Sequence, residues 1–309
     1  MEIRLLKRDE IEKRRGNGCV YYAPNSLIYA YTWYLDNVCE DWEGLVEFDG
    51  EHYVSVFPLV WNSRLFGVKR LYQPYLCQQL GLFTVNGFTE ERLKAFIAAI
   101  PTEYKHISIN LNDSNELKVL PGFQITEKPN YLLPLSLPYE KLRANYSSNL
   151  KRNLKKAEKA GLYSTTSIKP EDFVAAVKEM QKAKNNIFPE GLYHSAHRII
   201  YNCMHRGQGV IMASYNAEHE LCAAIFWMTN GARIINLLNV TTEVGREIGA
   251  MHYLVDIYVQ SNAGKPMFID FEGSSVDSIA RFYQSFGAEN HPYFNLKQNR
   301  LPWWLKWKG

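Results

Sequence analysis

Cysteine is scarce in this sequence of 309 residues, which contains five in all. Their number is odd, they are scattered, and no two have the C-x-x-C spacing that is typical of zinc and redox sites. A disulfide framework is therefore not expected, and a reducing compartment such as the cytoplasm is favoured. His194 and His197 have the helical spacing of a metal pair, but no third ligand accompanies them, so the sequence predicts no metal site.

Long apolar runs and a strong net charge are also missing. No apolar stretch is long enough to span a bilayer, and the charged N-terminus lacks the apolar segment of a signal peptide. The net charge is only +3, so DNA is not an expected partner, and any other nucleic acid has to be attracted by a local patch. Walker loops, G-x-S-x-G elbows and zincin motifs do not occur.

Aromatic residues, by contrast, are plentiful, with 20 Tyr, 15 Phe and 7 Trp. The length fits two domains of about 150 residues each, and we expect them over residues 1–130 and 131–309. Helix-like and strand-like segments alternate in both, and Asp49-Gly50 and Asn230-Gly231 are typical of hairpin turns. The sequence therefore predicts α/β domains with mixed sheets.

One stretch of the C-terminal half has the pattern strand, turn, helix, strand, helix. Residues 234–240 are nearly all apolar, as in a strand buried on both faces, and a second short strand covers 267–271. The turn after the first strand, Thr241–Gly249, contains Gly245 and Gly249, which allow a close approach of backbone to a ligand. Free amides at a helix N-terminus favour anions, so we expect this turn to hold a pyrophosphate or another anion. The alternative is a plain turn whose glycines serve packing.

Three side chains near the second strand are candidates for proton transfer. Asp270 and Glu272 alternate around Phe271, so both carboxylates are expected on one face, where one of them acts as a general base. The alternative is a carboxylate that caps the next helix or pairs with Arg281. Tyr283 is a candidate general acid, or else a member of an aromatic core. Asn239, which precedes the turn, orients a substrate or caps the turn.

Basic residues repeat along a predicted helix over 139–160. Lys151, Lys155 and Lys159 lie at four-residue steps, flanked by Arg152 and Lys156. We expect Lys151, Lys155 and Lys156 to bind an anion, such as a tRNA or CoA phosphate or a lipid head group; the alternative is a solvated lysine face. The C-terminal PWWLKWKG is either an interfacial membrane anchor or a tail docked on the first half.

Two motifs resemble the GNAT superfamily of N-acyltransferases. Arg246 and Gly249 match its pyrophosphate loop Q/R-x-x-G-x-G/A, while Met251 replaces the final small residue. The resemblance implies that Arg246, Gly249 and neighbouring positions such as Ala250 hold the donor. Tyr283 and Gly287 match the superfamily's Y-x-x-x-G, whose tyrosine commonly protonates the departing thiolate.

Three further segments, 73–81, 145–162 and 268–288, resemble the Fem-type, double-GNAT transferases. The resemblance implies two tandem GNAT-like domains, with the active site in the C-terminal one. It implies N-acyl transfer from an acyl-CoA-type donor to a small-molecule or lipid-linked amine, with peripheral contact to a membrane. One alternative is Fem-type transfer from aminoacyl-tRNA to a cell-wall precursor. Another, which Met251 favours, is a catalytically silent binding protein with this fold.

Overall fold

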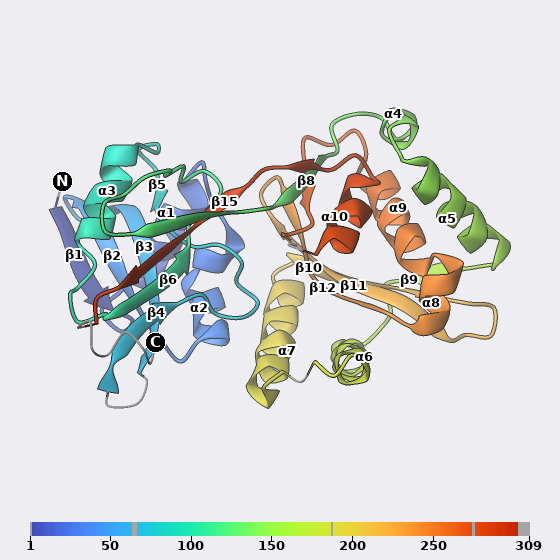
Figure 1. The fold of residues 1–309 in the computed structure, drawn as a ribbon, viewed down its shortest axis with the longest axis horizontal. Coiled ribbons are helices and arrows are strands. Elements are labelled where there is room, and N and C mark those ends of the chain that lie inside the picture. The colour runs from blue at the N-terminus through green and yellow to red at the C-terminus, as the bar shows by residue number, and fades with distance from the viewer. Residues whose placement is uncertain (1, 64–66, 187, 274–275, 302–309) are drawn as a thin grey trace. The chain divides into compact units, whose positions relative to one another are not determined.

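The computed structural model describes residues 2–63, 67–186, 188–273 and 276–301, and the chain forms two compact units (Figure 1). Unit 1 consists of Met1–Lys128 and Pro292–Gly309, and unit 2 of Pro129–His291. The chain thus leaves the first unit after Lys128 and returns to it at Pro292. The tryptophan-rich tail lies outside the described residues, so its two alternative roles stay predictions.

Unit 1 is a mixed sheet with helices α1, α2 and α3. The strand order is β1-β2-β3-β4-β6-β15-β7, and β5 pairs with β3. The elements are β1 (Glu2–Lys7), α1 (Lys13–Tyr22), the 3-10 helix η1 (Ile28–Ala30), α2 (Thr32–Val38), β2 (Asp41–Asp49), β3 (His52–Ser63), β4 (Lys69–Tyr72), β5 (Phe83–Thr84), α3 (Glu90–Ala98), β6 (His106–Asn110), β7 (Gln124–Lys128) and β15 (Tyr293–Asn299). The last strand, expected with the C-terminal half, pairs with β6 and β7 because Phe294 and Leu296 join the core of this unit.

Unit 2 is a second mixed sheet, with strand order β14-β8-β13-β12-β11-β10-β9. The elements are β8 (Tyr131–Pro134), α4 (Tyr139–Ala144), α5 (Ser148–Lys159), β9 (Tyr163–Thr165), α6 (Pro170–Ala183), α7 (Glu190–His205), β10 (Gly209–Tyr215), β11 (Leu221–Asn230), β12 (Arg233–Thr241), α8 (Glu243–Ile248), α9 (Ala250–Asn262), β13 (Phe268–Asp270), α10 (Asp277–Gln284) and β14 (Glu289–Asn290). Helices α5, α9 and α10 share the core on one face, and α6 and α7 lie on the other (Figure 1). The α/β prediction with mixed sheets is confirmed.

The sequence predicts continuous helices over 26–38 and 139–160, and the structure interrupts both. Tyr31 has an extended backbone, and the Thr32 amide donates to Asn17 Oδ1 at 2.9 Å, so η1 and α2 are separate. In the basic segment, α4 ends before α5 begins, because the Ser147 hydroxyl caps α5 by accepting from the Leu150 amide at 3.1 Å. A side-chain bond to a free amide at a helix start replaces the bond that continuation of the previous helix would supply.

Both predicted hairpins form, with each turn one residue later than expected. Asp49 pairs with His52 and Asn230 pairs with Arg233, so both residues belong to the strands. The glycines that follow them, Gly50 and Gly231, have φ of +57° and +58°. A positive φ is therefore required at the glycine of each turn, where it carries no steric cost.

His252 is buried on α9 among aromatic rings, with Phe282 at 4.8 Å and Phe286 at 6.4 Å between ring centroids. Burial lowers its pKa to about 4, from an ordinary value near 6.5. As the pH falls below about 6.5, His252 is therefore protonated in the unfolded chain but stays neutral in the folded chain, which favours unfolding. Lowering the pH from about 7 to about 5 is expected to cost about 2 kcal/mol through this residue.

The measurement is urea unfolding of the wild type and His252→Leu at both pH values. Comparing the two chains isolates His252 from Asp256, whose pKa burial raises and which therefore acts with the opposite sign. An equal pH dependence in both chains would contradict the assignment.

Candidate active site

In the described residues each sheet contains one parallel pair of strands. In unit 2 this pair is β12 and β13, and their pairing ends after three residues. Arg233–Ile235 of β12 pair with Phe268–Asp270 of β13, and β13 ends there while β12 runs on to Thr241. Leu237 is an extra residue in β12, since the register with β11 shifts opposite Phe226 and Trp227. Bulges of this kind re-aim a strand and often lie beside active sites. The carboxyl end of a parallel pair is also where open α/β sheets bind ligands.

The corresponding pair in unit 1, β4 and β6, is followed by a loop that fills the same position. After Tyr72 the chain turns back, and the Leu80 amide donates to Asn110 O at 2.9 Å. Amide side chains hold this loop: Gln73 bonds to Cys77 O, and Gln79, which is fully buried, accepts from the Asp113 amide. The candidate site therefore belongs to unit 2, where β12 is followed directly by helices.

The turn after β12 presents a helix N-terminus. The Thr242 hydroxyl caps α8 by accepting from the Gly245 amide at 3.0 Å. Gly249, with φ +78°, then separates α8 from α9, and no side chain caps α9. Arg246 is exposed in the last turn of α8. The first turn of α9 and Arg246 thus offer positive potential to an anion.

The two glycines of this turn also meet the chain's own backbone. A Cβ on Gly245 would lie 1.9 Å from Cys222 O, and one on Gly249 would lie 2.8 Å from Asn153 O. Close packing, the alternative interpretation from the sequence, therefore accounts for both glycines. What favours a ligand is the uncapped α9 N-terminus together with Arg246; Thr241 lies half-buried at the end of β12, and Ala250 is buried.

Asp270 is almost fully buried, at 1% exposure, and is held on both sides. Its Oδ2 lies 2.7 Å from Nη1 of Arg233, and its Oδ1 accepts from the Glu272 amide at 2.8 Å. Its partner is thus Arg233, at the start of β12, and no ion pair is recorded with Arg281 in the described residues. Sequence analysis missed Arg233, because only the register between two strands brings it to Asp270.

Glu272 does not continue the strand alternation that the sequence suggested. β13 ends at Asp270, and Glu272 has φ +57°, a left-handed conformation that is unfavourable for a side chain other than glycine. The two carboxylates therefore do not project as neighbours on one strand face. Backbone strain of this kind is stored where the surrounding structure imposes it, often at functional sites.

Tyr283 lies in α10 and is 8% exposed. Its ring stacks on Phe271 with 4.8 Å between centroids and lies 5.8 Å from Tyr131. Burial raises the pKa of Tyr283 above its ordinary value, and the nearby charges of Glu272 and Asp270 raise it further. The phenol is therefore protonated at neutral pH, and the same raised pKa makes it a weaker acid than a free tyrosine. Tyr283 packs in the aromatic core and also lies near both carboxylates.

Asn239 and the lysines of α5 lie around this turn. Asn239 is exposed on β12, where its Nδ2 donates to Asn236 Oδ1 at 3.3 Å. Lys151, Lys155 and Lys156 are exposed on α5, whose backbone at Asn153 meets Gly249. The structure thus brings α5 beside the α9 N-terminus, and brings Asp270, Glu272 and Tyr283 together after β13.

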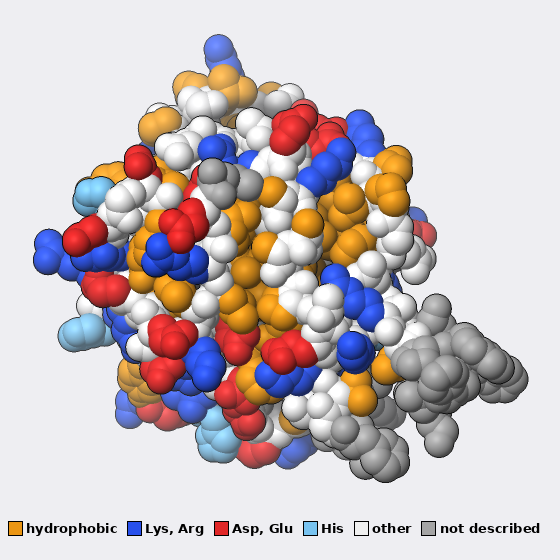
Figure 2. All heavy atoms as spheres, turned by 90° about the vertical axis from the view of Figure 1, so that its left-hand side faces the viewer, with side chains coloured by type: hydrophobic (Ala, Val, Ile, Leu, Met, Phe, Trp, Pro, Cys, Tyr) orange, Lys and Arg blue, Asp and Glu red, His pale blue; other side chains and the backbone are white. Residues whose placement is uncertain are grey.

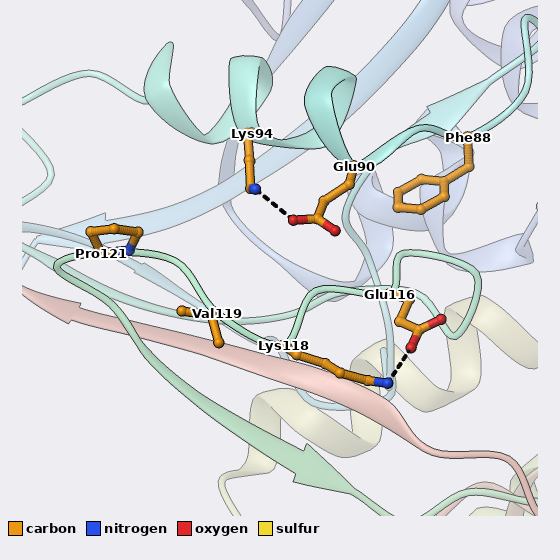
Figure 3. A pocket seen from close by; sticks show the side chains of 7 residues that line it. All are labelled: Phe88, Glu90, Lys94, Glu116, Lys118, Val119 and Pro121. Carbon is orange, nitrogen blue, oxygen red and sulfur yellow. Dashed lines mark ion pairs between the residues drawn. The ribbon is translucent and has the colours of Figure 1, made fainter.

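A groove of about 670 Å³ lies elsewhere, between α3 and residues 116–121 of unit 1 (Figure 3). Its charged side chains pair with each other, Glu90 with Lys94 at 2.5 Å and Glu116 with Lys118 at 2.8 Å. It contains none of the residues that the sequence singled out. In the described part of the chain, no three His, Cys, Asp or Glu side chains gather as metal ligands, and no helix has the length and apolarity to cross a bilayer.

No family model and no curated protein sequence matches the chain. Solved structures match over nearly its whole length. FemX is 12% identical with a TM-score of 0.67, covering 96% of this chain and 97% of its own. The C-terminal domain of a protein assigned as a lysylphosphatidylglycerol synthetase from Agrobacterium fabrum is 11% identical with a TM-score of 0.54, covering 93% and 91%. The L-PGS of Bacillus licheniformis is 9% identical with a TM-score of 0.53, covering 95% and 94%. At such identities the likeness concerns the fold alone, and it confirms the predicted α/β fold of the Fem type.

Proposed function

From the fold that this chain shares with FemX, we propose that it transfers an acyl group from an acyl-CoA-type donor to an amine. The site is the place in unit 2 where β12 and β13 part. The observation that carries the proposal is that β12 leads from this parting through the short helix α8 to α9, whose N-terminus no side chain caps. An extended donor could lie along the open edge of β12 with its phosphates at α9, because amides there attract anions.

The proposed reaction forms an N–C bond and breaks the C–S bond of the donor. Arg246 and the first-turn amides of α9, beginning at Ala250, hold the donor's phosphates, while Thr241, Gly245 and Gly249 shape the turn that presents them. Glu272 takes a proton from the attacking amine, and Tyr283 gives its proton to the departing thiolate. Asp270 and Arg233 fix the backbone of Glu272 in place, so that Asp270 is a positioning residue in this scheme.

Residues outside this proton-transfer group hold or attract the substrates. Asn239 orients the acceptor at the open edge of β12. Lys151, Lys155 and Lys156 raise the local concentration of an anionic substrate, since long-range attraction speeds its encounter with the site.

A second candidate is aminoacyl transfer from tRNA to a cell-wall precursor, as the Fem-type resemblance implies. The cations of α5 favour it, because they lie beside the same helix N-terminus and could contact tRNA phosphates. A catalytically silent binding protein is the third candidate. Met251 favours it, because this side chain stands in place of a small residue and packs against the core of unit 2.

Thermal unfolding with and without acetyl-CoA tests the donor site. A ligand at a hundred times its dissociation constant is expected to add about 2.7 kcal/mol of stability. Arg246→Ala is expected to weaken binding by about tenfold, because one charge-assisted contact to phosphate is lost. The matched control is Arg198→Ala, an exposed arginine of α7, which is expected to bind as the wild type does.

Equal binding in both variants would remove Arg246 from the donor site. No stabilisation by acetyl-CoA, together with steeply salt-dependent binding of aminoacyl-tRNA, would favour the second candidate. Binding of neither acetyl-CoA nor aminoacyl-tRNA would favour the third candidate, a catalytically silent binding protein.

A further inference from the structure

Positive charge is concentrated in the segment that contains α4 and α5. Residues 139–159 include seven Lys and Arg but only two Glu, which gives +5 in a chain whose total is +3. The rest of the protein therefore has a net charge of −2. Elsewhere the two signs are interspersed, as on the face shown in Figure 2.

The cations of α5 all face outward, because its other side is in the core. Leu150, Leu154 and Ala157 are buried against unit 2. The exposed side carries the cations Lys151, Arg152, Lys155, Lys156 and Lys159. Figure 1 places α5 as the outer helix beside α9 within this unit. A helix of twelve residues spans about 18 Å, so these charges form one continuous strip, which we call the α5 basic face.

The α5 basic face is not neutralised by the protein. Within the described residues none of its five cations forms an ion pair; Lys151 Nζ donates to Ala144 O at 3.0 Å and Arg152 Nη2 to Asn149 Oδ1 at 2.7 Å. On α6, by comparison, Lys178 and Lys182 each bind a glutamate at 2.7 Å. Unpaired like charges on one helix repel one another, so the face is suited to an external anion.

We propose that the α5 basic face docks this protein on an anionic lipid bilayer. Each Lys or Arg near such a surface contributes about 1 kcal/mol, so four or five suffice for reversible binding. The buried apolar side cannot insert, so the contact is electrostatic. Four of the five cations are lysines, which bind as point charges and suit a fluid array of head groups.

Aromatic rings that would stack on RNA bases are scarce in this segment. The only aromatic residues of α4, α5 and the turn between them are Tyr139 and Tyr146. Tyr146 is 3% exposed, and the Tyr139 hydroxyl is engaged by both oxygens of Asp256 at 3.0 and 2.9 Å. The Tyr146 ring is therefore closed to an unpaired base, and the Tyr139 ring packs against the core of unit 2. The proposal shares Lys151, Lys155 and Lys156 with the proposed function, but vesicle binding is measured without donor or acceptor, so the two can fail separately.

Co-sedimentation of the full chain with vesicles tests the proposal. Vesicles of phosphatidylcholine with about 30% phosphatidylglycerol are expected to bind the chain at least tenfold more tightly than phosphatidylcholine alone. Raising the salt from about 50 to about 300 mM is expected to weaken that binding by tenfold or more, because the shorter Debye length screens the face.

The decisive variant is Lys151→Gln/Lys155→Gln/Lys159→Gln, which removes three charges and is expected to bind about 100-fold more weakly. The control is Lys178→Gln/Lys182→Gln/Lys184→Gln, on α6 and at its C-cap, with the same change in net charge and a loss below about threefold expected. Thermal unfolding checks that both variants fold.

Three results would overturn the proposal. Equal losses in the two triple variants would show a response to net charge alone. Salt-resistant binding to neutral vesicles would assign the contact to the C-terminal tryptophans. Binding to an RNA hairpin without binding to anionic vesicles would assign the face to nucleic acid.

Discussion

Replacing Glu272 with glycine is expected to raise the free energy of unfolding by about 1 kcal/mol and to lower turnover by about 100-fold or more. The backbone of Glu272 has φ +57°, which glycine adopts without strain and other residues do not. The same change removes the carboxylate that we propose as the general base near Tyr283. Urea unfolding measures the stability, and release of the CoA thiol from acetyl-CoA with an amine acceptor measures the turnover.

The control for this change is His219→Gly in the turn between β10 and β11. His219 has φ +62° and is exposed, so glycine relieves the same strain without removing a group that we assign to the reaction. Its bond to the Tyr163 hydroxyl is also exposed and contributes little. A gain in stability without loss of turnover is expected there. Full turnover in Glu272→Gly would exclude Glu272 as the base, and a loss of stability would show that its side chain holds the turn.

Replacing Arg233 with alanine is expected to lower the free energy of unfolding by about 3–5 kcal/mol, because it leaves the buried carboxylate of Asp270 without its cation. Arg233 is 11% exposed and Asp270 is 1% exposed, so water replaces little of the lost interaction. Turnover is expected to fall as well, since Asp270 also holds the Glu272 amide. Denaturant unfolding and the thiol-release assay measure the two effects.

Two further variants test whether the loss of stability in Arg233→Ala arises because the ion pair is buried. Lys178→Ala breaks an ion pair whose side chains are 34% and 60% exposed, and a loss within about 1 kcal/mol is expected. Arg233→Ala combined with Asp270→Asn is expected to be more stable than Arg233→Ala alone, because the unpaired charge is gone. If Arg233→Ala cost no more than Lys178→Ala, the pair would have to be solvated, and its positioning role would fail.

The two units differ at the carboxyl end of their parallel strand pair. Both sheets contain one parallel pair, and both pairs are short. In unit 1 the loop after β4 returns beside β6, fixed by buried Gln and Asn side chains, and its own backbone occupies the carboxyl end of the pair. In unit 2 the chain passes from β12 into α8 and α9. The carboxyl end of the parallel pair is therefore bordered by the edge of β12 and by the N-terminus of α9.

The sequence by itself determined the features that depend on short-range periodicity. The apolar run of β12, the helix that follows its turn and the two hairpins were all predictable, because each follows from residues that are close together in the sequence. The motifs around Arg246 and Tyr283 also led to the fold that the solved structures confirm.

Only the tertiary structure decided how the candidate side chains are held. Arg233 and Asp270 are 37 residues apart, and they meet because β12 and β13 are in parallel register. Gly245 and Gly249 leave no room for a side chain, because the backbone of Cys222 and of Asn153, from other elements, lies against them. Contacts of this kind depend on long-range packing, which local periodicity does not encode. The same strand pattern can pair with neighbouring strands in several registers, and only the formed sheet fixes which residues meet.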